Sequence, residues 1–159
     1  MIFLTVGTQL PFDRLVQTVD IWAKEHPKIV FFGQIGKSIF KPKNIPHKTE
    51  LSPLEYDKYI NDCELIISHA GIGTILNAID LKKRIIIFPR RADLNEHRND
   101  HQMATARWLK NRKGIYIAQN SDELFNLLDK YKNLYSPQNI SQHASGKLIK
   151  TIRSYLLEK

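Results

Sequence analysis

The sequence predicts an α/β fold with a doubly wound, mostly parallel sheet of six strands and helices on both faces. Three observations lead to this prediction. Short apolar runs, typical of buried strands, alternate along the chain with longer amphipathic segments, typical of helices. Glycine turns follow several of the apolar runs. The 159 residues, 42% hydrophobic and 25% charged, suit one globular domain over residues 1–159. We expect the strand order 3-2-1-4-5-6.

Strand and helix candidates alternate in chain order. The expected strands span residues 2–6, 28–32, 45–49, 65–67, 84–88 and 115–117. The expected helices span residues 12–25, a segment beginning at residue 53, a short segment through residues 75–79, and residues 100–111, 122–131 and 141–158. Apolar residues recur in the helices at spacings of three or four, as Leu15, Val19 and Trp22 do in the first helix.

Capping residues mark several of the helix starts. Pro11 favours the beginning of the first helix, because its missing N–H is not needed there. Ser52, Pro53 and Glu55 form a capping-box pattern with proline at the first helical position. Ser121 is expected to cap the fifth helix.

Charge and cysteine content restrict the surroundings of the chain. The net charge of +8 favours acidic partners such as nucleotides, nucleic acid or anionic lipid. The single cysteine, Cys63, allows no disulfide within the chain, which fits a reducing compartment. We see no signal peptide and no apolar run near the ~20 residues of a membrane span.

Two polar segments follow neighbouring strands of the predicted sheet. Residues 68–74 follow the fourth strand and lead into a helix with Ile75, Leu76 and Ile79 on one face. Residues 89–102 follow the fifth strand. Parallel α/β sheets bind ligands at the carboxyl ends of their strands. We therefore interpret the two segments as two walls of one site.

The first segment has the composition of an anion-binding turn. Gly71 and Gly73 let the backbone approach a ligand, the N–H groups of the following helix face it, and Thr74 adds a hydroxyl. A tight turn without a ligand fits the same spacing. Leu76 occupies the third glycine position of the dinucleotide fingerprint, and no P-loop lysine follows. A nicotinamide cofactor and a triphosphatase site are thereby disfavoured.

Three histidines lie in the two segments. His69 follows a strand, where it is placed to hydrogen-bond a phosphate or sugar hydroxyl, or to cap its own turn. Residues 95–102 are dense in groups that suit sugar hydroxyls, although a solvated loop has the same composition. His97 and His101 are four residues apart, but no third metal ligand is evident. We expect no metal site.

Basic residues are frequent between residues 82 and 113. They are Lys82, Lys83, Arg84, Arg90, Arg91, Arg98, Arg107, Lys110, Arg112 and Lys113. A solvated cationic face explains most of them, and a few are expected to meet diphosphate or membrane. Since the aromatic and basic interleaving of RNA-binding sheets is missing, we expect no nucleic-acid partner.

Four motifs, in order, resemble one family. They are VGTQLPFDRL at residues 6–15, ISHAGIGT at 67–74, PR at 89–90, and NEH with DHQ within 95–102. They are similar to the C-terminal-domain family of glycosyltransferases shared with the lipid-linked N-acetylglucosaminyltransferase of peptidoglycan synthesis. The chain most resembles its short single-domain branch. That branch comprises the catalytic subunit of the eukaryotic two-subunit dolichol-pathway N-acetylglucosaminyltransferase and bacterial relatives in capsule and exopolysaccharide synthesis.

The resemblance, which spans residues 1–128, implies a Rossmann-like domain, the donor-binding C-terminal half of a GT-B enzyme. It places donor diphosphate binding at His69, Gly71, Ile72, Gly73 and Thr74, sugar or ribose binding at Asn77, Glu96, His97, His101 and Gln102, and the cleft lining at Gly7, Thr8 and Gln9. Larger relatives often carry an acidic residue at the position of Asn77, so ribose binding here lacks that charge. We expect His101 and Gln102 to be surface residues that matter more for transfer than for stability.

The implied reaction transfers a hexose from a UDP-sugar, with inversion, to a polyprenyl-diphosphate-linked saccharide in exopolysaccharide or capsule synthesis. Galactose is the first expectation and glucuronic acid the second, and N-acetylglucosamine is also compatible. No cofactor is implied. The catalytic base has no candidate in this sequence and could belong to a partner.

The acceptor-binding half would then be a separate, membrane-anchored chain that holds this cytoplasmic chain at the inner face of the cell membrane. Residues 141–159 are expected to form a helix that docks a partner, lipid or its own domain. Two alternatives remain: a basic nucleic-acid-binding domain, supported by charge alone, and a non-catalytic nucleotide-binding module.

Overall fold

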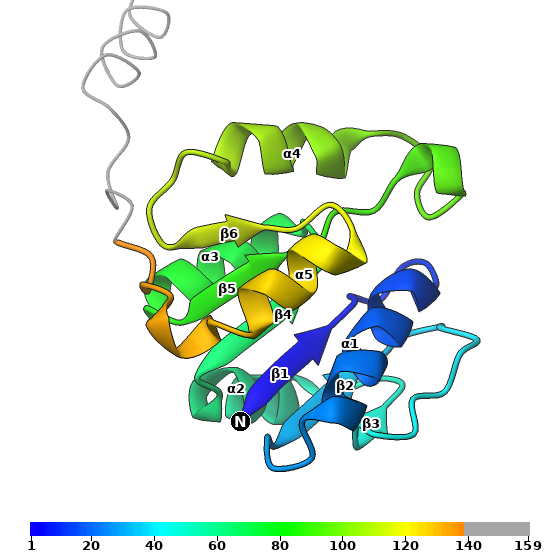
Figure 1. Ribbon diagram of the computed structural model, residues 1–159. Coiled ribbons are helices and arrows are strands. Elements are labelled where there is room, and N and C mark those ends of the chain that lie inside the picture. The colour runs from blue at the N-terminus through cyan, green and yellow to red at the C-terminus, as the bar shows by residue number, and fades with distance from the viewer. Residues whose placement is uncertain (139–159) are drawn as a thin grey trace, which may run out of the picture.

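The computed structural model describes residues 1–138, which form a six-stranded sheet with helices on both faces (Figure 1). The strands are β1 (Ile2–Thr5), β2 (Phe31–Gln34), β3 (His47–Lys48), β4 (Leu65–Ser68), β5 (Arg84–Ile87) and β6 (Ile115–Ile117). Their order, β3-β2-β1-β4-β5-β6, confirms the prediction. Every strand pair is parallel, so the sheet is wholly rather than mostly parallel.

The described residues form five α-helices and two 3₁₀ turns. They are α1 (Asp13–Glu25), α2 (Pro53–Asp62), α3 (Ile72–Asp80), η1 (Ala92–Leu94), α4 (His101–Leu109), α5 (Ser121–Leu128) and η2 (Tyr131–Asn133), of which α5 and η2 follow the last strand. None of these helices is long and apolar enough to cross a membrane. The helix expected at 141–158, with its docking role, lies outside the described residues.

Several predicted boundaries are wrong by a few residues. β2 begins at Phe31 instead of residue 28, because the chain first turns after α1, where Ile29 N donates to His26 O. The capping box of α2 is confirmed: Ser52 Oγ accepts from Glu55 N, and the Glu55 carboxylate accepts from Ser52 N. The cap of α5 is Asn120, not Ser121, since the Asn120 side chain accepts from the N–H of Glu123.

Two apolar clusters fill the two faces of the sheet. On one face, α1 and α5 cover β-strand side chains such as Leu4 and Ile67. On the other face, residues of α2, α3 and α4 cover side chains such as Phe3 and Ile66. Neighbouring residues of a strand thus point to opposite layers, so buried parallel strands are apolar throughout.

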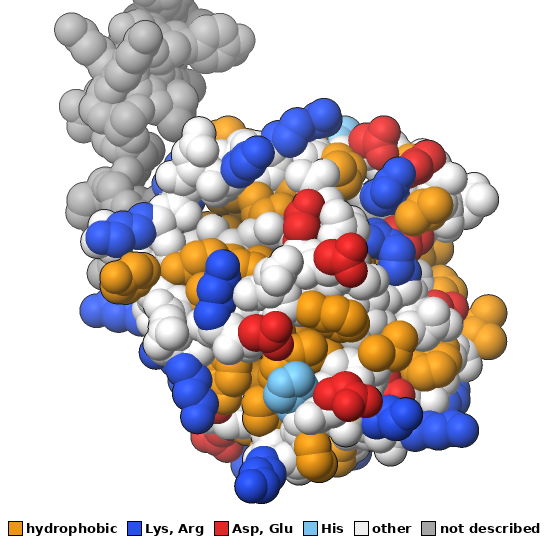
Figure 2. Space-filling model, viewed as in Figure 1, with side chains coloured by type: hydrophobic (Ala, Val, Ile, Leu, Met, Phe, Trp, Pro, Cys, Tyr) orange, Lys and Arg blue, Asp and Glu red, His pale blue; other side chains and the backbone are white. Residues whose placement is uncertain are grey.

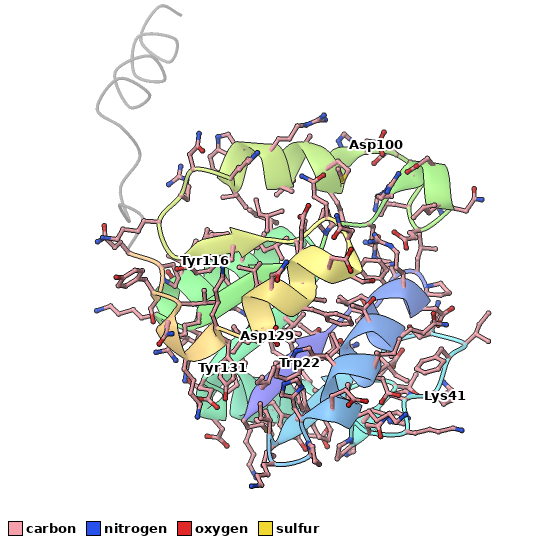
Figure 3. The ribbon with its side chains drawn as sticks, viewed as in Figure 1. Trp22, Lys41, Asp100, Tyr116, Asp129 and Tyr131 are labelled. Atoms are coloured by element: carbon pink, nitrogen blue, oxygen red, sulfur yellow. The ribbon has the colours of Figure 1, made fainter. Side chains whose placement is uncertain are left out.

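A polar contact joins the two helices of the first face. The indole Nε1 of Trp22 in α1 donates to Asp129 Oδ1 after α5, at 2.8 Å, and Figure 3 shows the two side chains meeting. Because Trp22 is 5% exposed, this hydrogen bond satisfies an indole N–H that is otherwise buried.

The predicted apolar face of α3 needs a correction. Ile75 and Ile79 are buried as expected, and the third buried residue is Ala78. Leu76 is 45% exposed. One residue advances the helix by about 100°, so the buried positions 75, 78 and 79 span about 100° and Leu76 lies about 60° outside that arc.

The chain direction places every strand-to-helix loop at one edge of the sheet. Neighbours β1 and β4 start connections that run to opposite sides of the sheet, β1 toward β2 and β4 toward β5. The loops after β1 and β4 therefore diverge and leave a crevice between them, the position at which doubly wound sheets bind ligands.

Candidate functional site

A cavity of about 360 Å³ opens at this crevice, at the carboxyl ends of β1, β4 and β5. It is lined by Val6, Gly7, Thr8, Gln9, Leu10, His69, Gly71, Gly73, Thr74, Arg90, His97 and Gln102. The lining thus comes from the loop after β1, the glycine turn after β4, the loop after β5 and the start of α4. The two walls predicted from the sequence are joined by a third, the β1 loop.

The imidazole of His69 lies between two glycines. A Cβ atom at Gly71 would stand 2.3 Å from His69 Nε2, and one at Gly7 would stand 2.8 Å from His69 Cε1. Any side chain at either position would displace the ring. Gly7 also has φ of +74°, a conformation that favours glycine. Glycine is therefore needed at both positions to leave room for the His69 ring, and not only to let a ligand approach the backbone.

His69 is neutral at physiological pH. Burial, and then the positive charge of Arg90, lower the pKa of His69 to about 4. Its Nδ1 is buried and has no hydrogen-bond partner among the described residues. A neutral imidazole at the cavity can donate or accept a hydrogen bond with a ligand while it carries no charge.

The N-terminus of α3 lies in the glycine turn after β4 and contributes to the cavity lining. Gly73 lies in its first turn, and an added Cβ there would meet no heavy atom within 4 Å, so its backbone is open to the cavity. The Thr74 hydroxyl accepts a hydrogen bond from Tyr56 Oη at 3.2 Å, which leaves its own O–H to donate. The free N–H groups and positive dipole end of this helix favour an anion.

Gln102 joins two walls of the cavity. Its Oε1 accepts from Ala70 N at 3.2 Å and from Arg90 N at 3.1 Å. With the oxygen so engaged, the amide N–H₂ group is left to face the cavity that Gln102 lines. The expectation of a surface residue is wrong, since Gln102 is 9% exposed, whereas His101 is exposed and does not line the cavity.

The sequence of the chain matches one protein family. A model of the glycosyltransferase family 28 C-terminal domain matches residues 1–155. The chain belongs to this family. No curated protein matches it by sequence.

Solved structures share the fold of this family 28 domain. The NMR structure of ALG13 has a TM-score of 0.64 and 18% identity, with 89% of this chain and 90% of ALG13 covered. MurG of Acinetobacter baumannii has a TM-score of 0.55 and 20% identity, covering 82% of this chain and 40% of MurG. The kitacinnamycin glycotransferase has a TM-score of 0.60 and 15% identity, covering 81% of this chain and 34% of the glycotransferase. The chain therefore spans well under half of the last two proteins, and these likenesses confirm the GT-B C-terminal fold.

The family 28 domain brings most, but not all, of the predicted site residues to the cavity. Those that line it are Gly7, Thr8, Gln9, His69, Gly71, Gly73, Thr74, His97 and Gln102. Ile72, Asn77, Glu96 and His101 do not line it. Ile72 is 56% exposed and Asn77 is exposed on α3, while Glu96 is held in an ion pair with Arg14.

Sequence reasoning missed the role of Arg90. The sequence gives Arg90 no individual role among ten basic residues, most of which a solvated face explains, yet Arg90 is 2% exposed and lines the cavity. Its position directly after Pro89, where an apolar strand ends, is the signal that separates it from the exposed Lys82 and Lys110.

A larger cavity of about 610 Å³ lies between α4, β6 and α5. It contains Met103, Arg107 and Tyr116 and none of the predicted site residues. We assign the site to the smaller cavity, because it combines the topological crevice, a helix N-terminus and convergent polar groups.

Proposed function

We propose that this family 28 domain is the donor-binding, catalytic subunit of a two-subunit inverting glycosyltransferase. It would move a hexose from a UDP-sugar to a polyprenyl-diphosphate-linked saccharide. The observation that carries the proposal is the cavity at the β1–β4 crevice, where the open first turn of α3 meets His69 and Gln102.

The cavity suits the donor diphosphate. The N–H groups in the first turn of α3 and the Thr74 hydroxyl would donate to phosphate oxygens, and the buried cation of Arg90 lies in the lining. The same donors would stabilise the charge that develops on the departing diphosphate during transfer. This arrangement supplies leaving-group stabilisation from the protein alone, and we propose no metal or cofactor.

The sugar and ribose would lie on either side of the diphosphate. Gln102 presents its amide N–H₂ group and His97 its ring, both of which suit sugar hydroxyls. Asn77 is one turn beyond Gly73 on α3, four residues along the helix, where its amide would reach a ribose hydroxyl. Galactose and then glucuronic acid are the proposed hexoses.

The acceptor and its base would come from a second chain. Inversion requires a base that deprotonates the acceptor on the face opposite the leaving diphosphate. Thr8 and Gln9 are exposed in the cavity lining, and Ile72 is exposed beside it, which leaves this edge open to a covering partner. A membrane-anchored partner would hold the subunit on the inner face of the cell membrane, in exopolysaccharide or capsule synthesis.

One face of the domain lacks the charge pattern of a nucleic-acid-binding surface. On the face shown in Figure 2, basic side chains are scattered and acidic ones lie among them, so this face presents no basic stripe. The experiment is isothermal titration of the full chain with UDP, ADP and single-stranded RNA. We expect saturable binding of UDP in preference to ADP. RNA binding without UDP binding would overturn the proposal in favour of a nucleic-acid-binding domain.

A further inference from the structure

Arg90 ties two walls of the cavity together. Its guanidinium donates to the carbonyl oxygens of Val6 at 2.9 Å, Leu10 at 2.7 Å and Pro11 at 2.5 Å, all at the end of β1 or in the loop after it. It also donates to Glu96 O at 3.2 Å, in the loop after β5. One buried side chain thereby fixes both loops, and its fixed fork of donors is what allows four acceptors to be reached.

A second arginine anchors the β5 loop to α1. Arg14 Nε and Nη2 donate to the two carboxylate oxygens of Glu96 at 2.6 and 2.7 Å. Arg14 also donates to Pro89 O at 2.9 Å, and Glu96 Oε2 accepts from Arg91 N at 2.9 Å. The side chains of Arg14 and Glu96 are 22% and 11% exposed. A bidentate, largely buried pair holds its loop more firmly than an exposed pair does.

The charges of this group do not balance. Among residues 1–138, the Arg90 guanidinium hydrogen-bonds only to carbonyl oxygens, and the acidic side chain that acts on it, Glu96, is already paired with Arg14. Two arginines and one glutamate leave one positive charge in excess beside the cavity. A bound anion would balance it, and burial strengthens such an attraction.

We propose that Arg14, Glu96 and Arg90 are positioning residues for the donor diphosphate. They hold the loops after β1 and β5 at a fixed separation and keep an unbalanced positive charge beside the α3 N-terminus. This inference rests on the proposed function, since it assumes that the cavity binds the diphosphate of a UDP-sugar.

A double-mutant cycle in UDP binding tests the inference. Glu96→Gln and Arg14→Gln are each expected to weaken UDP binding at least tenfold in the full chain, titrated well below its melting temperature. The two substitutions change the net charge in opposite directions, so a loss in both reports the position of the loops and not the charge. The double variant is expected to lose no more than either single variant, because both remove the same interaction. Arg14→Lys, which keeps the charge but not the fork, should give an intermediate affinity and serves if a glutamine variant fails to fold.

The matched control is Asp93→Asn, which breaks the exposed Arg91–Asp93 ion pair on the same loop, outside the cavity lining. It is expected to leave UDP affinity unchanged.

Uridine provides the second readout: positioning of the diphosphate predicts a larger loss of affinity for UDP than for uridine. Equal losses for both ligands, or additive losses in the cycle, would overturn the inference. If the unsubstituted chain binds UDP and the Glu96 and Arg14 variants bind it equally well, only this inference falls. If the unsubstituted chain does not bind UDP, the proposed function falls and takes the inference with it.

Discussion

Gly73→Asp is expected to weaken UDP binding roughly 200-fold while leaving the domain slightly more stable. The added side chain meets no heavy atom within 4 Å of its Cβ, so the fold accommodates it. Position 73 is also in the first turn of α3, where a carboxylate interacts favourably with the helix dipole and glycine is a poor helix former. These effects together should add about 1 kcal/mol to the free energy of unfolding, or ~2–4 °C to the melting temperature of a domain of this size.

The same carboxylate would oppose the donor diphosphate. At about 5 Å and an effective dielectric constant of about 40, two like charges repel by ~1.7 kcal/mol. A diphosphate presenting about two such charges would lose ~3 kcal/mol, which corresponds to roughly a 200-fold weaker affinity.

Isothermal titration with UDP and a thermal melt of the same samples provide the assay. Gly73→Asn is the matched control, because it adds the same bulk without the charge and should lose much less affinity. An unchanged UDP affinity in a folded Gly73→Asp variant would remove the α3 turn from the site. A strongly lowered melting temperature would instead refute the open position of residue 73.

Two further predictions concern stability. The pKa of His69 is about 4 in the folded chain against an ordinary value of 6.5, so between these pH values only the unfolded chain binds the proton. The free energy of unfolding should therefore fall by up to about 3 kcal/mol as the pH is lowered through this window, and urea titrations should show a shallower fall in His69→Gln; equal slopes would contradict the buried neutral histidine. Gln102→Ala leaves the N–H groups of Ala70 and Arg90 without an acceptor and should cost about 2–4 kcal/mol, whereas the exposed His101→Ala should stay within ~0.5 kcal/mol. Equal costs, measured by urea denaturation, would contradict the different placement of the two residues.

The fold could be predicted from the sequence because the patterns that mark its strands and helix ends lie within a few neighbouring residues. The central strands β1, β4 and β5 are short, mostly apolar runs, as expected for strands covered on both faces, and the capping box at Ser52 and Glu55 is complete within four residues. The alternation of these elements limits the topology to few choices, since crossovers in parallel sheets have one hand. Errors arose where a local rule has two solutions, as at Asn120 and Ser121, which are both good capping residues.

The site was only partly accessible, for a physical reason. The glycine turn and Gln102 have local signatures or motif resemblance. The partners of Arg90 are not local: Val6 and Leu10 lie 84 and 80 residues away in the sequence. Position 7 likewise requires glycine because of His69, which lies 62 positions later in the sequence. The pairing of β1 with β4 brings the two residues close together. Spacing along a chain carries no information about such contacts until the strands are in register.

Sugar transfer in the presence of a candidate partner is the most direct test of the central claim, that this chain is the donor-binding half of a two-chain enzyme. The full chain would be combined with membranes containing a membrane-anchored acceptor-binding chain, a polyprenyl-diphosphate-linked saccharide and radiolabelled UDP-galactose or UDP-glucuronic acid. We predict that label enters the lipid fraction only when both chains are present, and that Gly73→Asp abolishes the incorporation. Transfer by the isolated chain at the same rate, or no transfer by the pair from either donor while the isolated chain binds UDP, would contradict the account.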